Sequence, residues 1–80
     1  MAEIKIYGKD MCTFCKRAKE LAEQLQSQGK ASYEYIDIVD AGIDAAKLSE
    51  MVGAPVRTIP QIFVDGRPVG GYTEFSAMKF

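Results

Sequence analysis

The chain has 80 residues, of which 48% are hydrophobic and 26% charged, and its formal net charge is −1. This length supports one domain with one core, here expected over residues 1–80, and the composition is that of an ordinary globular protein. A nearly neutral chain does not fit nucleic-acid binding, which normally needs a strongly basic surface. Because no apolar stretch approaches the ~20 residues of a membrane-spanning helix, we expect neither a nucleic acid nor a membrane as partner.

The first residues bear on where the chain resides. Residues 1–5 begin an alternating pattern typical of a strand and not of a signal peptide. We therefore expect a cytoplasmic location, in the host cytoplasm if the chain is viral. In such a reducing compartment a pair of close cysteines is more often catalytic or metal-binding than a structural disulfide.

The first half of the chain predicts a βαβ unit. Alternation over residues 3–7 and 33–38 predicts two strands. Between them, apolar residues at a spacing of three and four over residues 13–28 predict an amphipathic helix that ends before Gly29. Two strands on either side of a helix are expected to pair in parallel through a right-handed crossover.

The second half predicts a short helix, a hairpin and a last helix. The short helix spans residues 44–51, and Asp65-Gly66 predicts a type I′ turn between strands at 61–64 and 67–69. Pro68 places the last strand at a sheet edge. Thr73 could cap a final helix running to residue 80, with Phe75, Met78 and Phe80 expected in the core. The order βαβ-α-ββ-α predicts a thioredoxin-like α/β fold, a mixed four-stranded sheet with helices on both faces.

Both cysteines of the chain, Cys12 and Cys15, lie at the expected start of the first helix. Residues three apart occupy neighbouring turns there, within reach of a disulfide bond. Unpaired N–H groups and the helix dipole favour the thiolate of Cys12, and nearby basic side chains such as Lys9 favour it further. Because the thiolate is the nucleophile, Cys12 is expected to attack and the more buried Cys15 to resolve.

Two other roles for the cysteines are weaker. A structural disulfide closing so short a loop would restrain little of the unfolded chain, and a reducing compartment would open it. A zinc site normally needs four protein ligands, whereas this chain has two cysteines and no histidine. Only a dimer or an added thiol could complete such a shell. The sequence therefore favours thiol–disulfide exchange.

Three separated motifs resemble those of the glutaredoxin family over nearly the whole chain. They are Cys-Thr-Phe-Cys at 12–15, Thr-Ile-Pro at 58–60 and Gly-Gly-Tyr-Thr-Glu at 70–74. The chain is most similar to small bacterial and phage dithiol glutaredoxins, including the type that reduces ribonucleotide reductase. The resemblance implies that the bond before Pro60 is cis.

The resemblance also implies a binding groove for glutathione. The N–H and C=O groups of Ile59 would pair with the cysteinyl unit, Lys9 would meet the glycyl carboxylate, and the N–H groups of Thr73 and Glu74 would hold the γ-glutamyl carboxylate. The family's pattern places ten residues of this chain around glutathione: Lys9, Thr13, Phe14, Thr58, Ile59, Pro60, Gly71, Tyr72, Thr73 and Glu74.

The chain departs from the family's commonest pattern inside the cysteine motif. Thr13 stands where dithiol members usually have proline, and Phe14 where they usually have tyrosine. In the family, loss of that proline accompanies an ability to hold a [2Fe–2S] cluster between two chains. Cluster binding is therefore one alternative function. A redoxin of the same fold that is reduced by thioredoxin reductase is another, although it would not need a full glutathione groove.

We therefore expect a glutathione-dependent thiol–disulfide oxidoreductase that acts on protein disulfides and glutathione mixed disulfides, with ribonucleotide reductase as one candidate substrate. Such an enzyme would serve electron transport, cell redox homeostasis and deoxyribonucleotide synthesis. It would work as a monomer without a tightly bound cofactor or metal, and glutathione would be its reductant.

Overall fold

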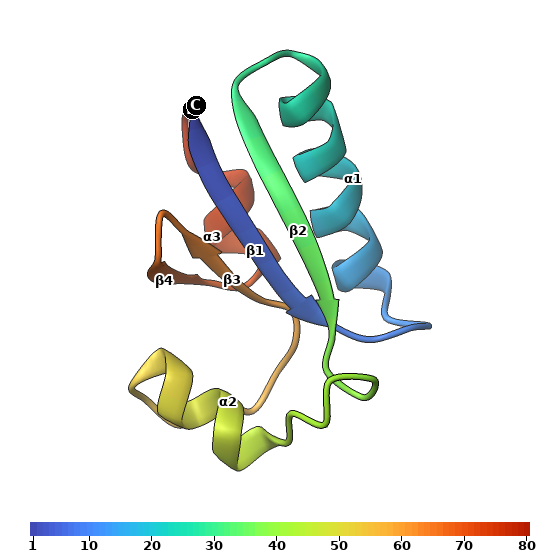
Figure 1. The fold of residues 1–80 in the computed structure, drawn as a ribbon, viewed down its shortest axis with the longest axis vertical. Helices are drawn as coiled ribbons and strands as arrows, with labels where there is room; N and C mark the ends of the chain where they lie inside the picture. The colour runs from blue at the N-terminus through green and yellow to red at the C-terminus, as the bar shows by residue number, and fades with distance from the viewer.

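The computed structural model describes residues 1–80 and contains four strands and three helices in the expected order (Figure 1). No helix is both long and apolar enough to cross a membrane. The elements are β1 (Ala2–Gly8), α1 (Thr13–Ser27), β2 (Ala31–Asp37), α2 (Ala45–Val52), β3 (Gln61–Val64), β4 (Arg67–Gly70) and α3 (Tyr72–Ser76).

The strands form one mixed sheet in the order β2-β1-β3-β4. β1 pairs in parallel with β2, in a register that sets Ile6 beside Tyr35 and Gly8 beside Asp37. β3 is antiparallel to both β1 and β4. The expected βαβ pairing is confirmed. The sheet therefore brings the loop after β1, which leads to the cysteines, close to the segment that enters β3.

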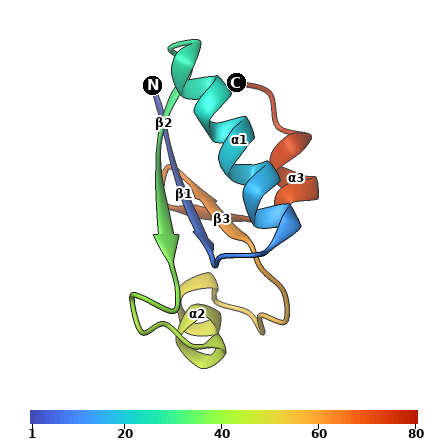
Figure 2. The same cartoon turned by 90° about the vertical axis from the view of Figure 1, so that its right-hand side faces the viewer.

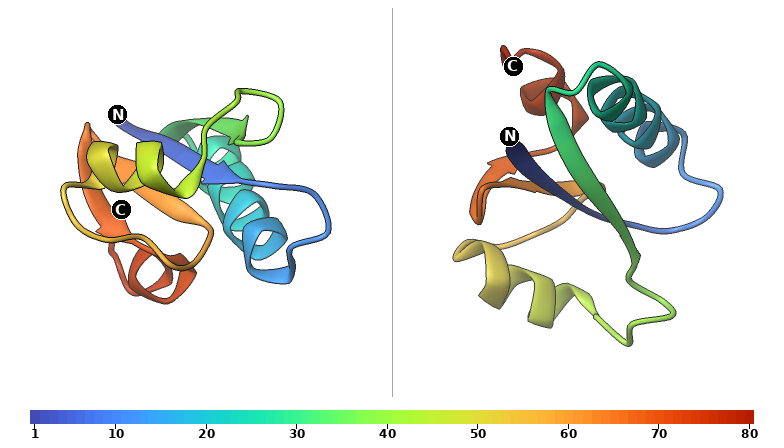
Figure 3. Two further views of the ribbon diagram at one scale, coloured as in Figure 1. Left: turned by 90° about the horizontal axis from the view of Figure 1, so that it is seen from below. Right: turned by 45° about the horizontal axis from the view of Figure 1, so that its top comes forward.

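The helices lie on both faces of the sheet, as predicted (Figures 2 and 3). α1 and α3 pack on one face, where a cluster of nine buried residues forms the main core. Leu48 of α2 packs on the other face against Tyr7 and Phe63. This division follows from the alternation of β1, because Ile4 and Ile6 point to α1 and Tyr7 points the opposite way.

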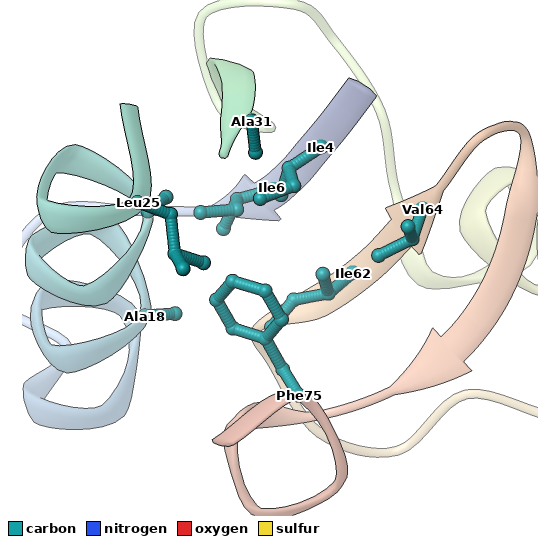
Figure 4. Packing of buried hydrophobic residues seen from close by; sticks show 9 residues of the cluster. Ile4, Ile6, Ala18, Leu25, Ala31, Ile62, Val64 and Phe75 are labelled. Atoms are coloured by element: carbon teal, nitrogen blue, oxygen red, sulfur yellow. The ribbon is translucent and has the colours of Figure 1, made fainter. Parts of the chain in front are cut away.

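Close contact between α1 and the sheet depends on small side chains. Ala18 and Ala22 are fully buried in the same cluster as Ile4 and Ile6. Figure 4 shows the Phe75 ring of α3 between Ala18 and Ile62. Alanine at the helix surface lets the α1 backbone approach the strands. The position of α1, and hence of its first turn, is fixed by this packing.

The β3–β4 hairpin has the predicted turn. Asp65 and Gly66 both have positive φ, 52° and 82°, as a type I′ turn requires. Asp65 also makes two hydrogen bonds with the backbone of Glu3 in β1. Its N–H donates to the Glu3 carbonyl oxygen at 2.8 Å, and its carboxylate accepts from the Glu3 N–H at 2.9 Å. Pro68 lies in β4 at the edge of the sheet, where a residue without an N–H is tolerated.

The prediction for the last helix was wrong in three respects. α3 ends at Ser76 instead of residue 80, Gly71 and not Thr73 is its N-cap, and Met78 is 38% exposed. The helix ends early because Ala77 and Met78 donate to carbonyls only three residues back, which tightens the last turn. Phe80 then returns to the core and contacts the Phe75 ring edge-on, with 5.9 Å between ring centroids.

Phe75 is a direct test of this packing. We expect Phe75→Ala to lower the free energy of unfolding by about 3–5 kcal/mol, because a fully buried aromatic ring is replaced by a cavity. Met78→Ala, on the same segment but exposed, should change it by less than about 1 kcal/mol. Denaturant unfolding of both variants measures the difference, and similar losses would contradict the assigned burial.

Candidate active site

Cys12 is the N-cap residue of α1, and its side chain lies over the first turn. Its extended backbone (φ −108°, ψ 114°) turns the thiol toward the helix, where Sγ accepts a hydrogen bond from the backbone N–H of Cys15 at 3.2 Å. An N–H donor and the positive end of the helix dipole both stabilise negative charge on sulfur. This is the arrangement expected for an attacking thiolate.

Cys15 is placed one turn further along α1 and is completely buried, while Cys12 is half-buried. Burial raises the pKa of Cys15 from 9.0 to about 11. The hydrogen bond and the charge of Cys12 add to the rise, whereas the Lys9 backbone and the Tyr35 hydroxyl oppose it. Cys15 is therefore a protonated thiol at neutral pH, and the two cysteines are chemically unequal.

The space around the Cys15 thiol exists because residue 8 is glycine. A Cβ atom on Gly8 would lie 2.8 Å from Cys15 Sγ and 2.6 Å from the Tyr35 hydroxyl oxygen, closer than real Cβ contacts. Tyr35 donates its hydroxyl hydrogen to the carbonyl oxygen of Lys9 at 3.2 Å. Burial, and then the nearby Cys15, raise the pKa of Tyr35 well above its ordinary value, so the hydroxyl keeps its proton.

Ile59 forms the wall opposite Cys12, and the Ile59–Pro60 bond is cis as the resemblance implied. The carbonyl oxygen of Ile59 lies 4.0 Å from Cys12 Sγ. No backbone group of the chain is hydrogen-bonded to the N–H or C=O of Ile59. The N–H is therefore available to an extended backbone laid beside Cys12, and the C=O is engaged only by the long hydrogen bond from the Cys12 thiol.

Eight of the ten residues expected around glutathione line one groove of about 260 Å³. The rings of Phe14 and Tyr72 face each other across it, with centroids 6.1 Å apart. The carboxylate of Glu74 accepts the N–H of Gly71 at 2.7 Å and so orders the turn before α3. The residues lining the groove are Phe14, Thr58, Ile59, Pro60, Gly71, Tyr72, Thr73 and Glu74.

The other two expected residues lie outside this groove. Lys9 lines a second pocket, which shares Thr58 and Ile59 with the groove. Thr13, the first residue of α1, is exposed and lines neither hollow.

Sequence reasoning missed three contributors to the site. The sequence pattern gives Gly8 no role beyond following the first strand and leading to the cysteines, and it gives Tyr35 no role beyond a place in the second strand. The parallel register that sets these strand ends beside α1 could have indicated both. Arg17 is basic and close to the cysteines in sequence, and its guanidinium lies 5.4 Å from the centre of the Phe14 ring, where an i, i+3 spacing on a helix places it.

Fold and site together define a class of protein. A thioredoxin-like sheet, two unequal cysteines at a helix N-terminus and an open backbone segment facing them describe a thiol–disulfide oxidoreductase. No group of three or more His, Cys, Asp or Glu side chains that could hold a metal ion occurs in the structure.

Comparison with known proteins identifies the family. The glutaredoxin family model matches residues 4–69. The chain is 46% identical to Haemophilus influenzae glutaredoxin over 76 residues, which cover 94% of this chain and 87% of that protein. Its structure resembles that of reduced Escherichia coli glutaredoxin with a TM-score of 0.85 at 45% identity, covering 94% and 89% of the two chains.

A third relative is the buckwheat glutaredoxin–glutathione complex, with a TM-score of 0.69 and 30% identity over 89% of this chain and 62% of that one. The chain therefore belongs to the glutaredoxin family. It is a glutathione-dependent thiol–disulfide oxidoreductase with a dithiol site at Cys12 and Cys15.

Gly8 gives a prediction about the Cys15 environment. Gly8→Ala should destabilise the reduced protein by about 1–3 kcal/mol, because the added methyl group overlaps Cys15 Sγ and the Tyr35 hydroxyl. In a Tyr35→Phe background the loss should be smaller, since one of the two clashing atoms is gone. Denaturant unfolding of the four proteins in the cycle measures this, and strict additivity would show that the hydroxyl is not involved.

The raised pKa of Cys15 gives a prediction about pH. The thiol ionises near 9.0 when exposed in the unfolded chain and near 11 when folded, so its contribution to stability is complete below pH 9 and is lost as pH rises through about 11. Carbon-13 NMR of β-labelled cysteine should show an inflection near pH 11 that Cys15→Ser removes. An inflection at or below pH 9 would contradict the burial argument.

Proposed function

We propose that Cys12 is the nucleophile of this glutaredoxin and Cys15 its resolving thiol. The observation that carries the proposal is their inequality within one helical turn. Cys12 Sγ lies at the N-terminal end of α1, accepts a hydrogen bond from the Cys15 N–H and is partly accessible. Cys15 is fully buried, and its pKa is raised to about 11. The accessible sulfur therefore has an N–H donor that can stabilise negative charge, whereas the buried thiol of Cys15 keeps its proton at neutral pH.

The reaction follows as a sequence of exchanges. The Cys12 thiolate attacks a protein disulfide, forms a mixed disulfide and releases one substrate sulfur as a thiolate. Cys15 then attacks the Cys12 sulfur, closes the Cys12–Cys15 disulfide and frees the reduced protein. One glutathione opens this disulfide and remains on Cys12, and a second removes it, so that two glutathione molecules become glutathione disulfide. A glutathionylated substrate needs only the Cys12 steps.

We place glutathione in the groove beside Cys12. Its cysteinyl unit would pair with the N–H and C=O of Ile59, neither of which is bonded to another backbone group, and its γ-glutamyl carboxylate would bind the N–H groups of Thr73 and Glu74. Lys9 lies beside Thr58 and Ile59, within the pocket next to the groove, and would meet the glycyl carboxylate there. The likeness to the buckwheat glutaredoxin–glutathione complex supports this placement. The exposed Thr13 would contribute only its backbone at the start of α1.

The same proposal extends to the setting of the reaction. Residues 1–80 would act as one glutaredoxin domain, monomeric and cytoplasmic, without a tightly bound cofactor. Ribonucleotide reductase is a candidate protein substrate, which would link the chain to deoxyribonucleotide synthesis and to redox homeostasis. The basis for this expectation is the resemblance of the three motifs to small dithiol glutaredoxins, and the chain is 47% identical to glutaredoxin 1 of Escherichia coli over 73 residues.

Single cysteine variants test the assigned roles. With NADPH consumption coupled through glutathione reductase, Cys15→Ser should keep the reduction of a small glutathione mixed disulfide and lose most reduction of a protein disulfide. Cys12→Ser should lose both, because no second accessible thiolate exists. Loss of both activities in Cys15→Ser would show that the roles are wrongly assigned.

Two further readouts separate the alternatives. Turnover that appears with thioredoxin reductase and not with glutathione would indicate a redoxin of another class. A brown chromophore after anaerobic purification with glutathione would indicate cluster binding between two chains, whereas a colourless monomer agrees with the proposal. Both measurements use the unmodified protein.

A further inference from the structure

A second and larger hollow lies beside the glutathione groove. Its volume is about 540 Å³, and seven of its eleven lining residues are hydrophobic. Ile38 and Ile43 come from the segment between β2 and α2, Leu48 from α2, and Val56 from the segment before β3. We refer to it as the apolar pocket.

The apolar pocket is held open by a fixed floor. Leu48 is 1% exposed and packs on Tyr7 and Phe63 of the sheet. Ile43 donates its N–H to the carbonyl of Ile38 at 2.8 Å. The Val56 N–H is likewise bonded to the Ser49 hydroxyl at 2.9 Å. At the rim, by contrast, the side chain of Val39 is 70% exposed, so apolar surface faces solvent beside this packed floor.

The apolar pocket continues the glutathione groove in one direction only. The two hollows share Thr58 and Ile59, the groove extending from there to residues 71–74 and the pocket extending to Lys9 and Arg57. A substrate that pairs antiparallel with Ile59 runs from residues 71–74 toward Thr58. The residues that follow its cysteine therefore arrive at the apolar pocket.

Glutathione does not fill this pocket. Its chain ends at a glycine, which has no side chain, directly after the cysteinyl unit. A polypeptide substrate continues, at about 3.3 Å per extended residue. Its next two side chains reach the space that glutathione leaves empty.

Charges at the rim agree with a peptide partner. Lys9 and Arg57 line the pocket together with a single acidic side chain, Asp44, which is already bonded to the Lys47 N–H at 2.8 Å. The rim therefore presents a net positive charge above an apolar floor, which fits an apolar side chain with a neighbouring acidic group.

On the basis of the function proposed above, we propose that the apolar pocket is a specificity site for protein substrates, which binds a large apolar side chain within the two residues that follow the reactive cysteine. Glutathione uses the groove and reaches the apolar pocket only at its Lys9 rim, through the glycyl carboxylate, without entering the apolar floor. Protein substrates use both hollows and are selected by the second.

Thiol exchange on Cys12 tests the proposal. The Cys15→Ser protein is first glutathionylated on Cys12 by glutathione disulfide, whose S–S bond is broken and which releases one glutathione. A peptide thiolate then attacks the Cys12 sulfur, forms a Cys12–peptide disulfide and releases glutathione as the thiol, with no net oxidation. The equilibrium constant is measured by mass spectrometry for three peptides of otherwise equal sequence, with leucine one residue after the cysteine, leucine two residues after it, or glycine at both positions.

We expect one leucine peptide to be preferred over the glycine peptide by about tenfold, equivalent to about 1.4 kcal/mol. Val39→Asp, which adds a charge at the exposed rim, should abolish this preference. Met78→Asp adds the same charge at an exposed site outside both hollows and should leave the preference intact. In methyl NMR spectra the Leu48 signals should shift with the leucine peptide and not with glutathione.

The outcomes separate the two proposals. Failure of glutathione disulfide to glutathionylate Cys12 would overturn the proposed function itself. Equal binding of all three peptides, or a leucine preference that Val39→Asp leaves unchanged, would overturn the specificity site alone. A concentration-dependent dimer that Val39→Asp dissociates would show that a second copy of the chain covers the pocket, and would also overturn it.

Discussion

The close packing of α1 on the sheet is the constraint on which the site depends. Ala18 and Ala22 are fully buried against Ile4 and Ile6, so the helix axis lies near the strands. Because α1 begins just after β1, this contact also sets the height of its first turn above the sheet. Cys12 is thereby held at the end of the helix with its sulfur over the Cys15 N–H, and Cys15 is pressed against Gly8. Packing in the core thus decides which sulfur is accessible.

The inequality of the two thiols has a single physical origin. Cys12 is at the N-cap of α1, where its sulfur meets an N–H donor. Cys15 lies one turn further along, between the helix and the sheet, where its surroundings are apolar. The first environment stabilises a negative charge and the second disfavours it. The position of each cysteine in α1 is therefore enough to make the two sulfurs different, without a basic side chain in contact with either of them.

Local patterns were sufficient to predict most elements, because alternation, helical spacing and turn residues all acted over short distances. The type I′ turn at Asp65 and Gly66 is one example. The end of α3 was not predictable in the same way, since it depends on Phe80 returning to contact Phe75. Gly8 and Tyr35 required the register between β1 and β2. The places of these residues depend on contacts between segments far apart in the sequence, which local helix and strand propensities do not report.

The position of β4 has a consequence for the molecule in a crowded solution. A sheet of four strands leaves two edges, and an unprotected edge can recruit strands from other molecules. β4 has four residues, one of them Pro68, which has no N–H to offer an incoming strand. The opposite edge, β2, carries the exposed charge of Glu34 near its middle. Each margin thus discourages intermolecular sheet growth, and the open backbone at Ile59 is left as the place where another chain can add itself in extended form.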